Sequence, residues 1–246
     1  MRWLLRIVLL LGGTVLLVLV AGFCWLYFYT RDLPDISRLA QYAPTTVTQA
    51  SDPCLGPSTA VPYEAIGANV RSAITAVEVT ENEQGILRQT LRGFFGSELQ
   101  HHGNAGASWI IGRTMFCAAS NRLSRRLAEF RTGIQLERRY TGRQLFTIFA
   151  NRAYFGQEQY GVYVASDRYF HKIPADLNLS QAALLVALIR SPSMYSPIKH
   201  PDRALRRRNE VIDAMVENGS ITALEAQAAR GDPLGLVVNA GAITPP

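Results

Sequence analysis

Two arginine pairs, one of them followed by a glutamate, are the residues of this chain best suited to binding an anion. Arg125 and Arg126 precede Glu129 by four and three positions, so on a helix all three lie along one flank. Arg207 and Arg208 form the second pair. Guanidinium groups bind phosphate in a bidentate geometry, and a carboxylate can act as a general base. Taken alone, the first group favours an ordinary surface ion pair, which contributes about 0.3–0.5 kcal/mol.

The overall charge also points to an anionic partner. The net charge is +6, and it rests almost wholly on arginine because Lys172 and Lys199 are the only lysines. A basic protein held at a membrane favours anionic lipid head groups or pyrophosphates. A generically basic, arginine-rich protein is the alternative. No zinc-finger spacing or aromatic RNA-binding motif is present, so we expect no nucleic-acid partner.

Residues 143–208 carry a long series of landmarks in fixed order. They are Asn151, Tyr154–Gly156, Tyr160–Gly161, Tyr169–Lys172, Ala182–Ala187, Ser191–Pro192 and Arg207–Asn209. This stretch resembles, nearly residue for residue, the C-terminal half of the family 51 glycosyltransferases, the peptidoglycan transglycosylases. The resemblance implies a mainly α, lysozyme-like domain. It also implies polymerisation of lipid II into glycan chains, with release of undecaprenyl pyrophosphate, for cell wall biogenesis and cell shape.

The family's first motif, E-D-x-x-F-x-x-H-x-G, is preserved in part. Glu78 matches the glutamate that serves as general base, and Val79 replaces the aspartate. The G-I-L-R sequence at residues 85–88 arrives early, so the phenylalanine and histidine portion is deleted. His101 and His102 follow this point instead of preceding it, and we interpret them as exposed loop residues with no catalytic or metal-binding role.

The second and third motifs differ in how much they retain. In the second, G-[GA]-S-T-I-T-Q-Q, Ser108 is kept, and Arg113 stands where the family has a glutamine. The third, R-K-x-x-E, is kept as Arg125, Arg126 and Glu129. The resemblance implies that Ser108 and Arg113 bind substrate, that the arginine pair faces the pyrophosphate, and that Glu129 is a second catalytic acidic residue.

The fourth and fifth motifs supply further substrate-binding candidates. The fourth, E-x-Y-L-N, keeps Asn151, but Thr147 replaces its glutamate. The fifth keeps Arg207 and Arg208, and Lys172 lies in the matched block between the fourth and fifth motifs. The resemblance implies that Asn151, Lys172, Arg207 and Arg208 bind substrate. It also implies a divalent cation, Mg or Mn, although no residue of the sequence is assigned as a metal ligand.

These losses leave two functions open. The first is a working inverting glycosyltransferase with Glu78 as base and with Arg125, Arg126 and Glu129 on the pyrophosphate side; whether or not catalysis survives, both arginine pairs, Glu78 and Glu129 are expected to share one cleft. The second is a catalytically degenerate pseudoenzyme that binds lipid II or acts as a scaffold for other cell wall synthesis proteins. A lytic muramidase is a weaker third reading, because the retained arginines suit a pyrophosphate leaving group.

An apolar run near the N-terminus predicts a membrane anchor. Residues 7–28 carry no charge and would span roughly 33 Å as a helix, enough to cross a bilayer core. Arg2 and Arg6 precede the run, which favours a single-pass protein of the bacterial inner (plasma) membrane with its domain on the periplasmic side. A cleaved signal peptide is the main alternative. A lipoprotein signal at Cys24 is disfavoured because Phe23 precedes it.

We divide the chain into four segments. They are a transmembrane anchor (1–30), a proline-rich juxtamembrane linker with little regular structure (31–62), the transglycosylase domain (63–230) and a flexible tail (231–246). Cys54 and Cys117 could form a disulfide in an oxidising periplasm or remain two unrelated buried thiols.

Helical patterns dominate the domain, and no pattern predicts a substantial sheet. Apolar residues from Leu123 to Ile134 recur at three- and four-residue spacing. A second helix is expected to begin after Asn178, with Ser180 as its N-cap, and to end at Pro192. A third is expected over about 202–218, with Gly219 as its C-cap.

Overall fold

The protein is mainly helical, as its sequence predicts. The structure, a computed structural model, describes residues 2–29, 33–77, 111–112, 114–116, 123–189 and 191–237, with some residues of α1 and α5 described through their backbone only. In chain order its elements are α1 (Arg2–Tyr29), η1 (Ile36–Tyr42), β1 (Thr48–Asp52), β2 (Gly56–Ala60), η2 (Tyr63–Ile66), α2 (Ala68–Val77), α5 (Leu123–Arg139), α6 (Gly142–Arg152), α7 (Val162–Phe170), η3 (Pro174–Asp176), α8 (Leu179–Leu188), α9 (Pro201–Glu217) and α10 (Ala223–Gly231). Within these residues the one sheet is the two-stranded hairpin β1–β2.

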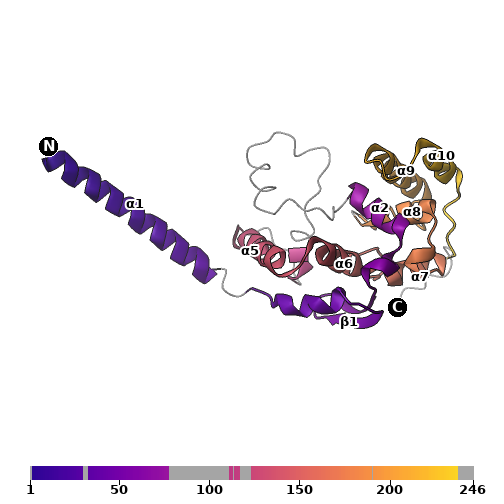
Figure 1. Cartoon of the computed structure of the whole chain (residues 1–246), viewed down its shortest axis with the longest axis horizontal. Coiled ribbons are helices and arrows are strands. Elements are labelled where there is room, and N and C mark those ends of the chain that lie inside the picture. The colour runs from indigo at the N-terminus through magenta and orange to yellow at the C-terminus, as the bar shows by residue number, and fades with distance from the viewer. Residues whose placement is uncertain are drawn as a thin grey trace.

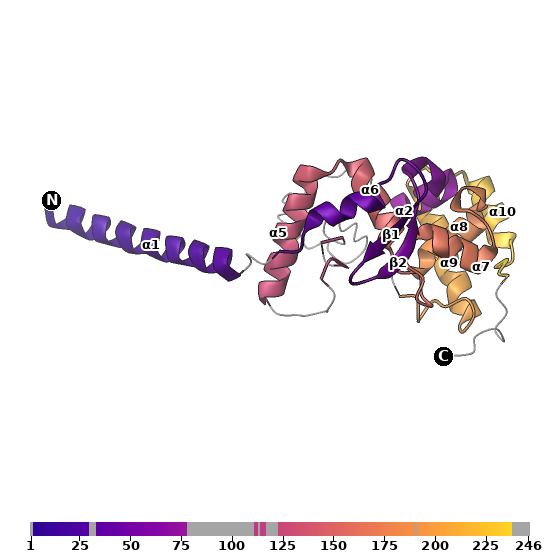
Figure 2. The same ribbon diagram turned by 90° about the horizontal axis from the view of Figure 1, so that it is seen from below.

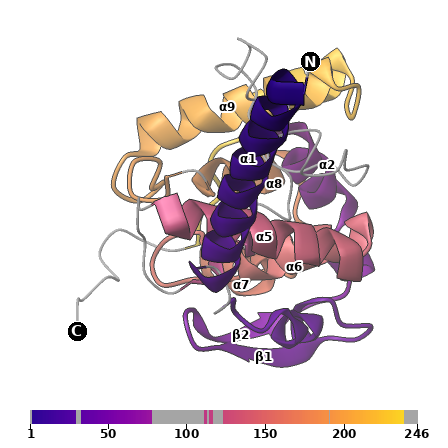
Figure 3. The same ribbon diagram turned by 90° about the vertical axis from the view of Figure 1, so that its left-hand side faces the viewer.

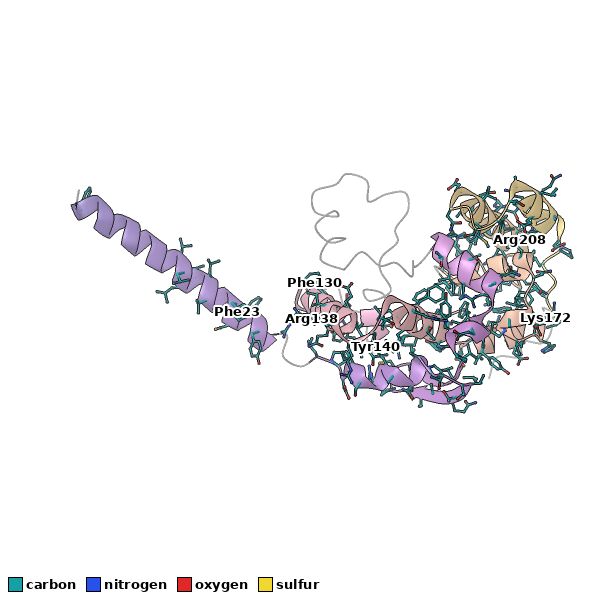
Figure 4. All side chains as sticks on the ribbon, viewed as in Figure 1. Phe23, Phe130, Arg138, Tyr140, Lys172 and Arg208 are labelled. Carbon is teal, nitrogen blue, oxygen red and sulfur yellow. The ribbon has the colours of Figure 1, made fainter. Side chains whose placement is uncertain are left out.

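Helix α1 extends away from the rest of the molecule, and its last turn comes close to α5 (Figures 1 and 2). The guanidinium of Arg131 on α5 lies over the ring of Tyr27, 5.7 Å from its centroid. Phe23 is 70% exposed on α1 (Figure 4). Among the described residues, no helix has both the length and the apolar character that crossing a bilayer requires. The anchor at residues 1–30 stays a prediction.

Helix α8 forms the centre of the core. Every residue from Ser180 to Leu188 is buried, and the helix packs against α2 and α9. A helix that is apolar on all sides must be covered on all sides, which explains why other helices surround this one. Its N-cap is Asn178, whose side chain accepts the amide hydrogen of Gln181 in a capping box. The expected cap, Ser180, is wrong by two positions, and its hydroxyl instead accepts a hydrogen bond from Arg208.

The segment expected to be an irregular linker is ordered and belongs to the domain. Residues 33–62 contain η1 and the hairpin, in which Thr48 pairs with Ala60 and Asp52 with Gly56. Leu39 and Tyr42 are both 0% exposed. The prolines of this stretch suggest loose structure, but burial of these two apolar side chains under α6 outweighs that local tendency. Figure 3 shows the hairpin forming one edge of the domain.

The end of α9 agrees with the sequence-based expectation, whereas the expected tail from residue 231 does not. Helix α9 ends at Glu217, and Gly219 follows it with a φ of 75°, as the sequence predicts. Residues 231–237 do not form a free tail, because the amide of Val237 donates to the carbonyl of Tyr169 at 3.0 Å and Leu234 and Leu236 pack against the core. Residues 238–246 lie outside the described residues.

The structure shows the state of two cysteines, Cys24 and Cys54. Cys24 is free and exposed, whereas Cys54, in the turn of the hairpin, is disulfide-bonded. The alternative of an isolated thiol is therefore wrong for Cys54. Cys117 lies outside the described residues.

Candidate active site

The arginine–glutamate pair of the third motif lies on the first turns of α5. Nε of Arg125 is 2.9 Å from Oε1 of Glu129, and the two side chains are 16% and 8% exposed. The same guanidinium stacks on the ring of Phe116, 3.7 Å from its centroid, and its Nη2 donates to the Phe116 carbonyl at 3.3 Å. Because the pair is largely shielded from water, its attraction is screened far less than that of an exposed ion pair.

The end of the second motif packs directly on this turn of α5. Ile111 and Met115 are almost wholly buried. A Cβ added to Gly112 would lie 3.1 Å from the carbonyl oxygen of Glu129 and 3.4 Å from the amide nitrogen of Gly133. A Cβ at this position would be in tighter contact than ordinary packing allows, so glycine suits the close approach. The fold therefore brings the last described residues of the second motif against the acidic residue of the third.

Three charged residues that sequence reasoning did not single out lie beside this segment. Asp52 and Arg152 are each 2% exposed, and Arg152 donates to Asp52 at 2.6 Å. Nε of Arg38 is 3.7 Å from the same carboxylate. One sequence signal was present, because Arg152 directly follows Asn151 at the end of a matched motif. The partner carboxylate, a hundred residues earlier in a proline-rich stretch, carries no local signal.

Residues of the fourth motif serve the fold. Asn151 is 0% exposed. Its side chain donates to the carbonyls of Tyr42 and Val61, at 3.0 and 2.8 Å, and accepts from the amide of Val61 at 3.1 Å. Thr147 is buried, and its hydroxyl donates to the Arg143 carbonyl one turn earlier. The amide of Asn151 is enclosed and already bonded on both ends, which gives it a structural role, and the substrate-binding role that the resemblance implies stays a prediction.

Arg208 is also a structural residue. It is 1% exposed, and its five N–H donors meet protein oxygens: Asn209 Oδ1 twice, Ser180 Oγ, and the carbonyls of Arg230 and Asp232. Burial lowers the pKa of Arg208 from its ordinary value, and the charge of Asp232 opposes that shift. A guanidinium with every donor in use has none for a phosphate. The structure gives Arg208 a structural role, and the substrate-binding role that the resemblance implies stays a prediction.

Its neighbour Arg207 is more accessible, yet it too is engaged. Its side chain is 20% exposed, Nη1 pairs with Glu210 at 2.8 Å, and the guanidinium lies 5.8 Å from the ring centroid of Tyr195. Lys172 is exposed and donates to Oε1 of Gln181 at 3.1 Å. Lys172 and Arg208 lie at the end of the domain opposite α5, as the positions of Phe130 and Arg138 show (Figure 4).

The expected convergence of both arginine pairs is therefore not found. Arg208 lies among α8, α9 and α10, and Arg125 lies on α5 at the other end (Figures 1 and 2). Glu78, Ser108 and Arg113 lie outside the described residues, as do Val79, His101 and His102. Arg126 is placed on α5 by its backbone alone.

The candidate divalent cation has no ligand set in the described part of the chain. No group of three or more histidine, cysteine, aspartate or glutamate residues gathers there. Glu129 is the acidic residue of the α5 turn, and its Oε1 is held by Arg125.

Comparison with known proteins decides the family. The model of the transglycosylase family matches residues 55–216. This chain belongs to the transglycosylase family. The matched range begins in the hairpin and ends in α9, so it includes the α5 turn, the segment packed on it and the core helix α8.

The relatives of this transglycosylase are larger proteins. The chain is 30% identical over 228 residues to penicillin-binding protein 1A of Rickettsia bellii, covering 86% of this chain and 29% of the relative. It is 27% identical over 249 residues to penicillin-binding protein 1A of Aquifex aeolicus, covering 93% and 34%. It is 38% identical over 135 residues to penicillin-binding protein 1F of Bacillus subtilis, covering 55% and 19%. The chain thus spans about a third or less of these relatives.

A solved structure gives a weaker likeness. The crystal structure of penicillin-binding protein 1A from Haemophilus influenzae superposes with a TM-score of 0.41 and 19% identity, over 72% of this transglycosylase and 18% of that chain.

Proposed function

We propose that this transglycosylase is a peptidoglycan glycosyltransferase that polymerises lipid II. The observation that carries the proposal is the packing of the end of the second motif on the turn of α5 that holds Arg125 and Glu129. Two motifs that are separate in sequence meet in space, on the side of the domain where the shielded ion pair lies. The family match covers both of them.

The reaction follows from the groups that the family requires. The 4-hydroxyl of the acceptor sugar attacks the anomeric carbon of the donor, forming a new glycosidic bond as the bond to undecaprenyl pyrophosphate breaks with inversion. Glu78 takes the hydroxyl proton as general base. Arg126 stabilises the negative charge that develops on the leaving pyrophosphate. Arg125 orients Glu129, through the 2.9 Å contact, beside that leaving group.

The lipid tails of both substrates require a site beside a membrane. We propose that residues 1–30 anchor the chain as a single pass in the bacterial inner membrane, with the domain on the periplasmic side. The approach of α5 to the last turn of α1, through Arg131 and Tyr27, supports a site close to that anchor. N-terminal sequencing of the mature protein tests this, because a chain beginning near residue 30 would contradict it.

A degenerate, lipid II-binding protein is the second candidate, and Thr147 favours it. The residue stands where the family has a glutamate, and its hydroxyl is bonded within its own helix. This position therefore offers no carboxylate. Such a protein would keep an affinity for lipid II or for other cell wall synthesis proteins without turnover.

Incubation of the purified full-length protein with labelled lipid II in detergent separates the candidates. Polymer supports the glycosyltransferase, binding without product supports the degenerate protein, and cleavage of preformed glycan indicates a lytic muramidase. In the active case, Glu78→Gln should lower the polymerisation rate by about 10²–10⁴, because the amide cannot accept a proton. Substantial turnover in that variant would show that another residue is the base.

The proposed role of Arg126 can be tested against a matched control residue on the same helix. Arg126→Glu should weaken lipid II binding, whereas Arg138→Glu, an equal charge change at the exposed far end of α5, should not. Equal losses in both variants would reduce the role of Arg126 to general surface charge.

A further inference from the structure

Asp52 is the buried carboxylate of the hairpin, and it organises two arginines from different elements. Arg152 of α6 donates to its Oδ2 at 2.6 Å, and Nε of Arg38 in η1 lies 3.7 Å from the same oxygen. The other oxygen, Oδ1, accepts the amide of Cys54 at 2.8 Å. Burial opposes ionisation of Asp52, but the hydrogen bonds and charges of these partners hold its pKa below the usual range.

The arginines that Asp52 organises hold the chain directly after the second motif. Nη2 of Arg38 donates to the Met115 carbonyl at 2.8 Å, and Nη2 of Arg152 donates to the Thr114 carbonyl at 3.4 Å. The next carbonyl, that of Phe116, accepts from Arg125. Three consecutive carbonyls thus accept from guanidinium groups of η1, α6 and α5. We call Thr114, Met115 and Phe116 the clamped segment.

These contacts restrain the backbone of the clamped segment in addition to the packing of its side chains. A buried charge is costly unless it is paired, so the buried Arg152 keeps its position because Asp52 balances it. The partly exposed Arg38 lies 3.7 Å from the same carboxylate. Charge-assisted hydrogen bonds are roughly twice as strong as neutral ones. The bond from Arg38 to the Met115 carbonyl, at 2.8 Å, has that short geometry. The longer contacts from Arg152 and Arg125, at 3.4 and 3.3 Å, restrain the carbonyls on either side of it. The disulfide of Cys54 fastens the turn that carries the carboxylate.

We propose that Asp52 is a positioning residue that fixes the end of the second motif, Ile111 and Gly112, against α5 through Arg38 and Arg152. The proposal rests on the glycosyltransferase function above and extends it to residues of the hairpin and η1. In the family the second motif holds the donor substrate, so a loose clamped segment would misplace the donor-side groups without removing them. Asp52 itself touches no substrate.

The test compares Asp52→Asn with Asp213→Asn in the full-length protein. Asp213 also pairs with an arginine, Arg230, but both side chains are exposed, so it is a matched control. In Asp52→Asn, amide hydrogen exchange at residues 111–112 and 114–116 should rise about tenfold or more, because a charged partner is lost. Exchange in α8 should stay within about twofold of the parent. The KM for lipid II should rise more than kcat falls, and Asp52→Glu should restore part of the loss.

Unchanged exchange in the clamped segment, or an equal rise in α8, would overturn the proposal. If Asp52→Asn does not fold, Asp52→Glu gives a milder form of the same test, because it keeps the charge but displaces the carboxylate from Arg38 and Arg152. Exchange in the clamped segment should then still rise, while exchange in α8 stays unchanged. A parent protein that does not polymerise lipid II would refute the proposed function. The exchange measurement would still decide whether Asp52 positions the segment.

Discussion

The two ends of the domain use arginine in different ways. At the α8–α10 end, Arg208 is enclosed and all five of its donors meet protein oxygens. At the α5 end, Arg125 remains 16% exposed beside a shielded carboxylate, and Arg38 and Arg152 hold the segment that follows the second motif. Both arginine pairs of the sequence lie in motifs that resemble those of the family. The comparison teaches that a motif match marks residues that the fold needs as well as residues that the chemistry needs.

The largest expected effect concerns Arg208. Replacing it with methionine leaves the Ser180 hydroxyl, the Asn209 amide and two backbone carbonyls without their donor. We expect the free energy of unfolding to fall by about 3–5 kcal/mol, measured by urea denaturation. Arg206→Met, an exposed position on the same helix, should change it by about 0.5 kcal/mol or less. A stable Arg208→Met protein with weakened lipid II binding would instead give this end of the domain a substrate role.

Asn151 should give the next largest effect. Asn151→Ala removes three buried hydrogen bonds that join α6 to η1 and to the residue after β2, and we expect a loss of about 2–4 kcal/mol by the same measurement. Asn69→Ala is the control, because Asn69 donates one hydrogen bond, to the Leu177 carbonyl, and is partly exposed. Its loss should be about 1 kcal/mol. Equal losses would mean that the enclosed network around Asn151 adds nothing.

The dependence of the free energy of unfolding on pH should reveal the contribution of the Asp52 carboxylate. Its pKa is lowered in the folded protein, so its contribution to stability is present above the unfolded pKa of about 4 and is lost as the pH falls through the folded value. Urea midpoints measured from about pH 6 down to about pH 2.5 should therefore fall less steeply in Asp52→Asn than in the parent. Identical slopes would show that the hairpin carboxylate is not stabilised by its arginines.

The smallest effect is expected at Gly112. An alanine there would press its methyl group on the carbonyl of Glu129 at 3.1 Å, and we expect a cost of about 1 kcal/mol in thermal or urea unfolding. Gly231→Ala is the control, since nothing lies within 4 Å of a Cβ at that position. That variant should be neutral or slightly more stable. A neutral Gly112→Ala would mean that the second motif can move away from α5 at little cost.

The sequence predicted the elements well and the roles of single residues less well. The spacing of apolar residues indicated α5, the signals at Asn178 and Pro192 bracketed α8, and Gly219 marked the end of α9. These signals are local, so one stretch of chain is enough to see them. The roles of Asn151 and Arg208 depend on partners that are distant in sequence, such as Val61 and the Asp232 carbonyl, which no spacing rule reveals.

The same limit explains why residues 33–62 were misjudged. Their prolines and small polar residues favour an irregular connector when only neighbours are considered. What orders them is the pairing of Asp52 with Arg152 and the burial of Tyr42, both of which join positions about a hundred residues apart. The first motif falls outside the described residues, so the placement of Glu78 stays a prediction.

The contacts of Arg208 also set an order of events during synthesis of the chain. Two of its acceptors are the carbonyls of Arg230 and Asp232, which leave the ribosome more than twenty residues after Arg208 itself. Until those residues emerge, the Arg208 guanidinium lacks two of its hydrogen-bond acceptors and its charge is not yet buried between α9 and α10. The α8–α10 end should therefore be the last part of the domain to become resistant to protease on nascent chains of increasing length. A domain shortened to residue 228 lacks both carbonyls, so we expect its α8–α10 end to remain sensitive to protease.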